Sequence, residues 1–225
     1  MKRGFFIVLE GGEGSGKSTH SKRLKENLKK EGYRVILTKE PGGTRIGTQI
    51  RRILLKEENI DLVSLAELFL FLADRAQHVN QVIKPALKEG KVVICDRFSF
   101  SSLAYQGYGR KIALSLIKWL DRIATGGLRP DLVILLDVDP EKGLERSKKA
   151  GNENRFEKEP LEFHQRVNYG FKDLAKRNGH IIIDASLSKN EVERQILEAV
   201  LKKLKPVSLE RKSFKKLLAY AFANF

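Results

Sequence analysis

Short apolar runs alternate along the chain with longer stretches in which apolar residues recur at helical spacing. The runs cover residues 5–9, 33–38, 91–95, 132–138 and 180–184. Their β-branched and aliphatic residues favour strands. Those at 92–95 and 132–136 are apolar at every position, which is typical of central strands covered on both faces. The pattern predicts an α/β fold with a five-stranded parallel sheet and helices on both faces.

A glycine-rich segment, Gly-Gly-Glu-Gly-Ser-Gly-Lys-Ser, occupies residues 11–18, between the first run and a helical stretch at 20–30. This order of strand, loop and helix is the setting of a phosphate-binding loop. Its glycines permit positive φ, so that backbone N–H groups can face an anion at a helix N-terminus. The sequence therefore predicts a nucleoside triphosphate site made by Gly11, Gly12, Glu13, Gly14, Ser15, Gly16, Lys17, Ser18 and Thr19. Lys17 is expected to reach the β and γ phosphates, and Ser18 to ligate Mg²⁺.

Polar residues follow two other predicted strands. Residues 40–44 come after the second run, and Asp96 and Arg97 come after the third. Because the carboxyl ends of parallel strands meet at one edge of a sheet, these residues should lie near the phosphate loop. We expect Asp96 to hold Mg²⁺ or one of its waters and Arg97 to bind a phosphate. An ordinary salt bridge at the end of a strand is the alternative.

The stretch 67–75 has a helical pattern. The residues expected on its core face are Leu65, Leu68, Phe69 and Leu72. Phe71 and Arg75 are four residues apart and share a different face. A ring and a guanidinium so placed can stack on a base and donate to its edge or to its phosphate. The alternative is an apolar side chain covered by a charge.

A polar and basic segment at 145–157 is broken by Gly151 and is expected to form a lid at about 146–158. A closing arginine can stabilise charge on a transferring phosphoryl group and exclude water. Arg146 and Arg155 are the candidates. A solvated loop is the alternative.

The sequence also indicates which kind of group would accept a phosphoryl group from the bound nucleoside triphosphate. A phosphate monoester is largely dianionic near neutral pH and needs cations, whereas a hydroxyl acceptor usually needs a carboxylate base. Arg51, Arg75 and Arg97 lie on three separate predicted elements and could supply those cations. The Asn-Lys-x-Asp segment of guanine recognition is missing from the sequence, which argues against a GTPase.

The composition fits a single domain. The chain has 225 residues, of which 41% are hydrophobic, and a net charge of +15. The charge is spread along the chain, and a nucleic-acid partner is not expected. No apolar stretch approaches the roughly 18 residues of a membrane span, so we expect a cytoplasmic protein. Cys95, the only cysteine, lies in an apolar run and is expected to fill space.

Taken together, these residues resemble thymidylate kinase, the nucleoside monophosphate kinase that phosphorylates dTMP with ATP and Mg²⁺. The motifs that carry the resemblance are the phosphate loop, residues 40–44, Phe71 with residues 73–75, and residues 96–107. The resemblance covers about nine-tenths of the chain and implies the P-loop fold of the monophosphate kinases. It also implies a homodimer and a role in dTTP synthesis for DNA.

The resemblance further implies roles for single residues. Phe71 would stack on thymine, with Arg75, Ser102 and Gln106 near its polar edge. Arg51 and Arg97 would hold the acceptor phosphate. Tyr105 would crowd a 2′-hydroxyl, and Glu13 would face the 3′-hydroxyl. Because the phosphate loop has no arginine, the chain resembles the bacterial type, in which the lid supplies the catalytic cation, here Arg146 or Arg155.

The chain departs from the family at two places. Phe98 stands where a tyrosine or histidine is expected, so a hydrogen bond from that ring is absent. Residues 206–225 follow the kinase-like domain at 1–205, and their apolar positions recur from Phe214 to Phe225 at helical spacing. We expect a basic amphipathic helix packed on the body or on a sister subunit. A membrane surface or another protein is the alternative contact.

Two other functions remain open at this stage. A related kinase could act on another monophosphate or on a nucleoside. A P-loop ATPase that binds nucleic acid would use the basic surface, and DNA-stimulated hydrolysis with a steep salt dependence would identify it.

Overall fold

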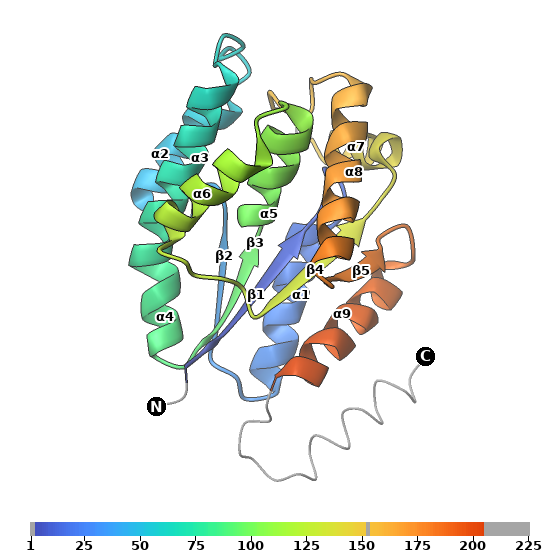
Figure 1. The fold of residues 1–225 in the computed structure, drawn as a ribbon. Helices are drawn as coiled ribbons and strands as arrows, with labels where there is room; N and C mark the ends of the chain where they lie inside the picture. The colour runs from blue at the N-terminus through green and yellow to red at the C-terminus, as the bar shows by residue number, and fades with distance from the viewer. Residues whose placement is uncertain (1–2, 152–153, 205–225) are drawn as a thin grey trace.

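Five parallel strands lie at the centre of the residues that the computed structural model describes, which are 3–151 and 154–204. The strands are β1 (Phe5–Glu10), β2 (Val35–Lys39), β3 (Val92–Asp96), β4 (Leu132–Asp137) and β5 (Ile181–Asp184). Their order across the sheet is β2-β3-β1-β4-β5 (Figure 1). Each strand overlaps one predicted run, so the predicted parallel α/β sheet is confirmed.

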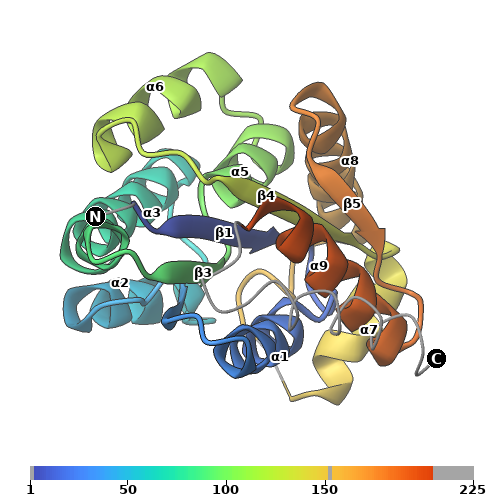
Figure 2. The ribbon, with the colours of Figure 1, turned by 90° about the horizontal axis from the view of Figure 1, so that it is seen from below.

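Helices connect the strands and cover both faces of the sheet. They are α1 (Lys17–Lys30), α2 (Arg45–Leu55), α3 (Ser64–His78), α4 (Lys84–Lys88), α5 (Ser99–Ser102), α6 (Leu114–Thr125), α7 (Pro140–Lys149), α8 (Leu161–Arg177) and α9 (Lys189–Lys203). Two π-helical stretches, η1 (Val79–Ile83) and η2 (Leu103–Gly109), continue α3 and α5. Helices α1 and α9 lie under one face, and α5 and α8 lie over the other (Figure 2).

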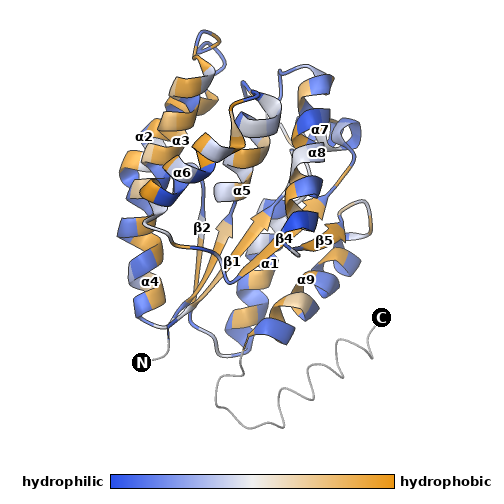
Figure 3. Ribbon diagram, in the orientation of Figure 1, coloured by the Kyte–Doolittle hydropathy of each residue, from blue (hydrophilic) through white to orange (hydrophobic). Residues whose placement is uncertain are grey.

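The alternation of side chains along β1 divides the core between these two faces. Ile7 and Leu9 join the cluster shared with α1 and α9, whereas Phe6 and Val8 face the opposite cluster. All four are at most 1% exposed, which explains why the run is apolar at every position. The strands are accordingly coloured hydrophobic, while the helices carry polar residues as well (Figure 3).

Strand β1 lies between β3 and β4; the connection after β1 leads to β2 at one edge of the sheet, whereas the connection after β4 leads to β5 at the other edge. Such a change of direction opens a crevice at the carboxyl ends of the strands, where ligands bind in open α/β sheets. The phosphate loop follows β1 and the pair Asp96 and Arg97 ends β3. The fold therefore brings the predicted motifs to one edge.

The predicted core face of α3 is partly wrong. Leu68 and Leu72 are buried, but Leu65 and Phe69 are 46% and 50% exposed. Helix α3 packs between α2 and α6 at the side of the molecule (Figure 1). Its remaining apolar stripe faces outward together with exposed apolar residues of these neighbours.

The described helices include none long and apolar enough to cross a membrane. The extension predicted at 206–225 and the lid residues 152–153 lie outside the described residues.

Candidate active site

The phosphate loop has the backbone that its glycines predict. Gly11, Gly14 and Gly16 have φ values of 148°, 62° and 85°, a region that side chains with a Cβ rarely adopt. Gly16 directly precedes the first residue of α1. The loop therefore ends at the N-terminus of α1, where the helix favours a bound anion.

The loop also touches α7 backbone to backbone. A Cβ on Gly14 would lie 2.0 Å from the carbonyl oxygen of Gly143 in α7. Likewise, a Cβ on Gly143 would lie 2.5 Å from the carbonyl oxygen of Glu13. Both distances are impossible for real atoms, so glycine is required on each side of this contact.

Lys17 reaches into the phosphate loop. Its Nζ donates to the Gly12 carbonyl at 2.6 Å and to Ser15 Oγ at 3.1 Å. Burial and the nearby Arg97 lower the pKa of Lys17 to about 8, although Asp96 and Glu13 act in the opposite direction. The ammonium thus lies within the phosphate loop, where it can meet a polyphosphate.

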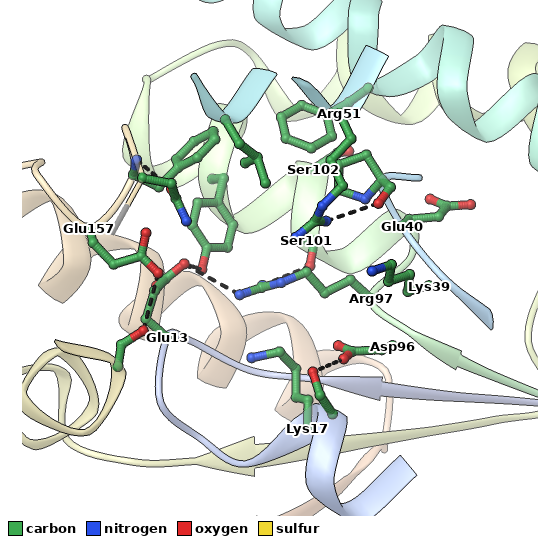
Figure 4. A pocket seen from close by; sticks show the side chains of 18 of the residues that line it. Glu13, Lys17, Lys39, Glu40, Arg51, Asp96, Arg97, Ser101, Ser102 and Glu157 are labelled. Carbon is green, nitrogen blue, oxygen red and sulfur yellow. Dashed lines mark hydrogen bonds and ion pairs between the residues drawn. The ribbon is translucent and has the colours of Figure 1, made fainter. Parts of the chain in front are cut away.

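Two oxygen groups lie beside Lys17. Ser18 Oγ donates a hydrogen bond to Asp96 Oδ2, across the gap between α1 and β3 (Figure 4). A hydroxyl and a carboxylate are hard oxygen donors of the kind that Mg²⁺ binds when it also contacts phosphates. The pair fits the predicted metal position. Thr19, the next residue, is exposed on α1 and does not line the cavity described below.

Glu13 is held by three side chains from other elements. Its Oε1 accepts from Tyr105 at 2.5 Å and from Arg97 at 3.3 Å, and its Oε2 lies 3.5 Å from His164 Nδ1. Burial alone would raise the pKa of Glu13, but His164, Arg97, Lys17 and Tyr105 outweigh it and lower the pKa to about 2. The carboxylate therefore stays charged and faces η2 and α8.

A cavity of about 270 Å³ joins the phosphate loop to the region around Phe71. The predicted site residues that line it are Glu13, Gly14, Lys17, Ser18, Arg51, Phe71, Asp96, Arg97, Ser102, Tyr105 and Gln106. These come from four separate stretches of the chain, at 13–18, 51, 71 and 96–106. The fold thus assembles both halves of the predicted site around one space.

Besides Lys17, three cationic side chains line this cavity, and they come from three elements. Arg51 of α2 donates to the Pro41 carbonyl at 2.9 Å, and burial followed by the charge of Arg97 lowers its pKa. Arg97 donates to the Gly11 carbonyl and to Ser101, and its backbone is left-handed with φ 71°. Lys39, at the end of β2, is the third (Figure 4). Such a cluster suits a phosphate dianion.

Arg75 does not belong to this cluster, contrary to its predicted role as an acceptor cation. It is 1% exposed, and all three of its guanidinium nitrogens donate within the protein. The acceptors are Glu40 at 2.8 Å, Asp121 at 2.8 Å, Ser102 at 3.0 Å and the Phe98 carbonyl at 3.1 Å. Two carboxylates neutralise it, so Arg75 supports Ser102 from behind.

The predicted lid arginines are hydrogen-bonded to other parts of the protein in this structure. Arg146 donates to the Ala185 carbonyl at 2.8 Å, beyond β5. Arg155 is buried and donates to Glu67 Oε2 at 2.6 Å, with its guanidinium over the Phe156 ring. A buried carboxylate holds its partner strongly because separation would leave two unpaired charges. Neither arginine lines the cavity.

Aromatic rings close the far end of the cavity. Phe71 and Tyr105 lie 6.0 Å and 5.6 Å from the Phe156 ring, between ring centroids. Phe98, in contrast, is buried against Phe6 on the core side. The departure at residue 98 therefore changes the core and leaves the cavity lining intact. Cys95 is buried and free, as predicted.

Sequence reasoning missed Lys39, Phe156 and His164. Lys39 directly follows a predicted strand, so its position at the strand's carboxyl end was a usable signal. Phe156 is the only aromatic residue in the polar segment 145–157. His164 carried no local signal, because α8 reaches the phosphate loop only through the fold.

Comparisons with known proteins agree with this geometry. The family model for thymidylate kinase matches residues 9–196. A thymidylate kinase from Synechococcus sp. is 51% identical over 201 residues, covering 88% of this chain and 96% of the relative. One from Halothermothrix orenii is 49% identical over 201 residues, covering 88% and 97%. The crystal structure of thymidylate kinase from Ehrlichia chaffeensis superposes with a TM-score of 0.73 at 36% identity, covering 88% of this chain and 99% of that one. The chain belongs to the thymidylate kinase family.

Proposed function

We propose that this chain transfers the γ-phosphoryl group of ATP to dTMP, yielding ADP and dTDP for dTTP synthesis. The observation that carries the proposal is the single cavity shared by Lys17 and Ser18 of the phosphate loop and by Arg51, Phe71 and Gln106 on the opposite side. Two nucleotides bound end to end in it would bring the donor phosphoryl group to the acceptor phosphate.

The donor side is built from the loop amides and Lys17. Ser18 and Asp96 would hold Mg²⁺, which offsets charge on the β and γ phosphates when bound. Lys17 and Arg97 donate to the carbonyl groups of Gly12 and Gly11 in the loop, and we assign charge stabilisation during transfer to them. Arg146 and Arg155 are held elsewhere by Ala185 and Glu67.

The acceptor side recognises a nucleoside monophosphate by charge and shape. Arg51, Arg97 and Lys39 would hold its phosphate, which needs no general base because it is already anionic. Phe71 would stack on the base, with Ser102 and Gln106 at its edge. Tyr105 and Glu13 are hydrogen-bonded to each other, and together they would form the wall of the sugar site and favour a deoxyribose.

A panel of monophosphates with MgATP tests this function directly. We expect kcat/KM for dTMP to exceed that for dCMP, dGMP and AMP, and thymidine to be a poor acceptor. Equal rates for all monophosphates would leave a general kinase and refute recognition of thymine. Turnover of thymidine without a phosphate would refute the role of the cation cluster.

We also propose that the protein is a homodimer. Helices α2, α3 and α6 pack side by side, and their exposed apolar residues are Ile46, Ile53, Leu65, Phe69, Leu116, Trp119 and Ile123. We call these residues the α2/α3/α6 face. Exposed apolar residues gathered on neighbouring helices are a usual site of association between protein chains, and the family resemblance favours a second copy as the occupant.

A further inference from the structure

Glu67 is a buried carboxylate that joins the base end of the cavity to the segment around Arg155. It lies in the first turn of α3 and is fully buried. Its Oε1 accepts from Gln106 Nε2 at 2.8 Å and, at the longer distance of 3.4 Å, from Arg110 Nε, and its Oε2 accepts from Arg155 at 2.6 Å and from Arg110 at 3.2 Å. No role in recognition follows from its position alone, because it does not line the cavity.

Its effect on Gln106 follows from hydrogen-bond chemistry. A carboxylate accepts hydrogen bonds and donates none, whereas a glutamine amide has one donating end and one accepting end. The Gln106 NH₂ group must therefore face Glu67, and the Oε1 atom must face the other way. Gln106 lines the cavity, and its Oε1 accepts no hydrogen bond from residues 3–151 or 154–204.

We infer that Glu67 is a positioning residue that fixes the Gln106 amide so that the cavity presents a hydrogen-bond acceptor to the edge of the acceptor base. This inference rests on the proposed function and adds the cause of its base selectivity. Thymine carries a ring N–H that can donate to Oε1. Cytosine has a bare ring nitrogen at the same position, so two acceptors would face each other without a proton. A site built around one hydrogen-bond pattern discriminates strongly against a base that leaves it unpaired.

The two arginines make the orientation robust. Arg155 and Arg110 both donate to Glu67, so any acceptor at this position is drawn toward them. In Glu67→Gln the side-chain oxygen would turn to the guanidinium groups and the NH₂ would turn to Gln106. Gln106 would then have to reverse, which would present a donor to the cavity and suit cytosine better than thymine.

The experiment measures kcat/KM for dTMP and dCMP, and KM for ATP, in the wild type, E67Q and a control, E159Q. Glu159 also pairs with Arg110, at 2.5 Å, but does not contact Gln106. We expect the preference for dTMP over dCMP to fall about tenfold or more in E67Q, with KM for ATP unchanged. E159Q should keep the wild-type preference. An unchanged preference in E67Q, or an equal change in E159Q, would overturn the inference.

Q106A provides a test that leaves the ion pairs in place, and it remains usable if E67Q does not fold. The dTMP preference should fall in Q106A, and adding E67Q should change it no further, because the effect of Glu67 passes through Gln106. Additive losses in the double variant would contradict this route. A wild type that does not phosphorylate dTMP would refute the proposed function itself, a result distinct from either outcome.

Discussion

Lys17 donates a hydrogen bond of 2.6 Å to the carbonyl of Gly12, so the cation of the phosphate loop is engaged by the loop itself. The same ammonium is buried and lies near Arg97, which lowers its pKa to about 8. A bound polyphosphate would replace the carbonyl with full negative charge and raise the pKa again.

ATP binding should therefore take up protons near pH 8. Between about pH 8 and pH 9 part of the free protein has a neutral Lys17, and binding must reprotonate it. We expect ATP affinity to fall as pH rises through 8, by up to about tenfold per pH unit. Titration calorimetry in two buffers of different ionisation enthalpy measures the uptake directly. Heats independent of the buffer at pH 8.5 would contradict the low pKa of Lys17.

Glu13 should act as a fixed charge in the acceptor site. Since its pKa is about 2, the carboxylate remains ionised throughout the range in which activity can be measured. Glu13→Gln should lower kcat/KM for dTMP by about tenfold or more, by the same factor at pH 6 and pH 8. Tyr105→Phe, which keeps the charge, should cost less. If kcat/KM of the wild type fell at low pH and that fall were absent in Glu13→Gln, Glu13 would be shown to titrate during turnover.

Substitutions of Arg75 and Arg51 should have different effects, one on stability and the other on dTMP binding. Arg75→Ala leaves Glu40 and Asp121 without their buried partner, and we expect a loss of about 3–5 kcal/mol in the free energy of unfolding. Arg51→Ala should leave stability within about 1 kcal/mol and raise KM for dTMP about 10- to 100-fold. Urea unfolding and steady-state kinetics on both variants give the comparison. Equal free energies of unfolding for Arg75→Ala and Arg51→Ala would contradict the structural role of Arg75.

Glu10 gives stability a pH dependence. Burial outweighs its contacts with Ser101 and Phe98 and raises the pKa of Glu10 from 4.5 to about 7. The folded protein therefore binds more protons than the unfolded chain between these values, and this contribution to stability is full below about pH 4.5 and lost as pH rises through 7. Glu10→Gln should flatten that part of the curve by up to about 3 kcal/mol. Urea unfolding from pH 5 to pH 8 measures it, and parallel curves would refute the raised pKa.

The α2/α3/α6 face should decide the oligomeric state. Trp119, 61% exposed on α6, is a large apolar anchor of the kind that dominates interfaces. Trp119→Glu should convert a dimer to a monomer in sedimentation velocity. Tyr169→Glu is the matched control, because Tyr169 is 64% exposed on α8, away from this face. Equal effects of the two substitutions would argue against this face as the interface.

The strands and the phosphate loop could be predicted because their signals are local. Burial on both faces makes residues 5–9 of β1 apolar, and positive φ requires glycine at positions 11, 14 and 16. The cavity lining was largely predictable as well, since parallel strands bring the residues after them to one edge. The roles that the resemblance implies for these residues stay predictions until measured.

Ion pairs between residues far apart along the chain could not be predicted from the sequence. Arg75 and Arg155 carry the same charge in the sequence as Arg51, but the buried carboxylates Glu40 and Glu67 hold them away from phosphate. Those carboxylates are 35 and 88 residues distant along the chain. Similarly, the exposure of Leu65 and Phe69 depends on where α3 packs, which spacing within one helix does not reveal.

The contact between Gly14 and Gly143 restricts how this protein can be engineered for heat tolerance. Replacing a glycine inside a helix with alanine usually gains about 0.5–1 kcal/mol, and Gly143 in α7 would be an obvious target. Here the added methyl group would strike the Glu13 carbonyl at 2.5 Å and push the phosphate loop out of shape. Screens for thermostable variants should therefore keep both glycines constant.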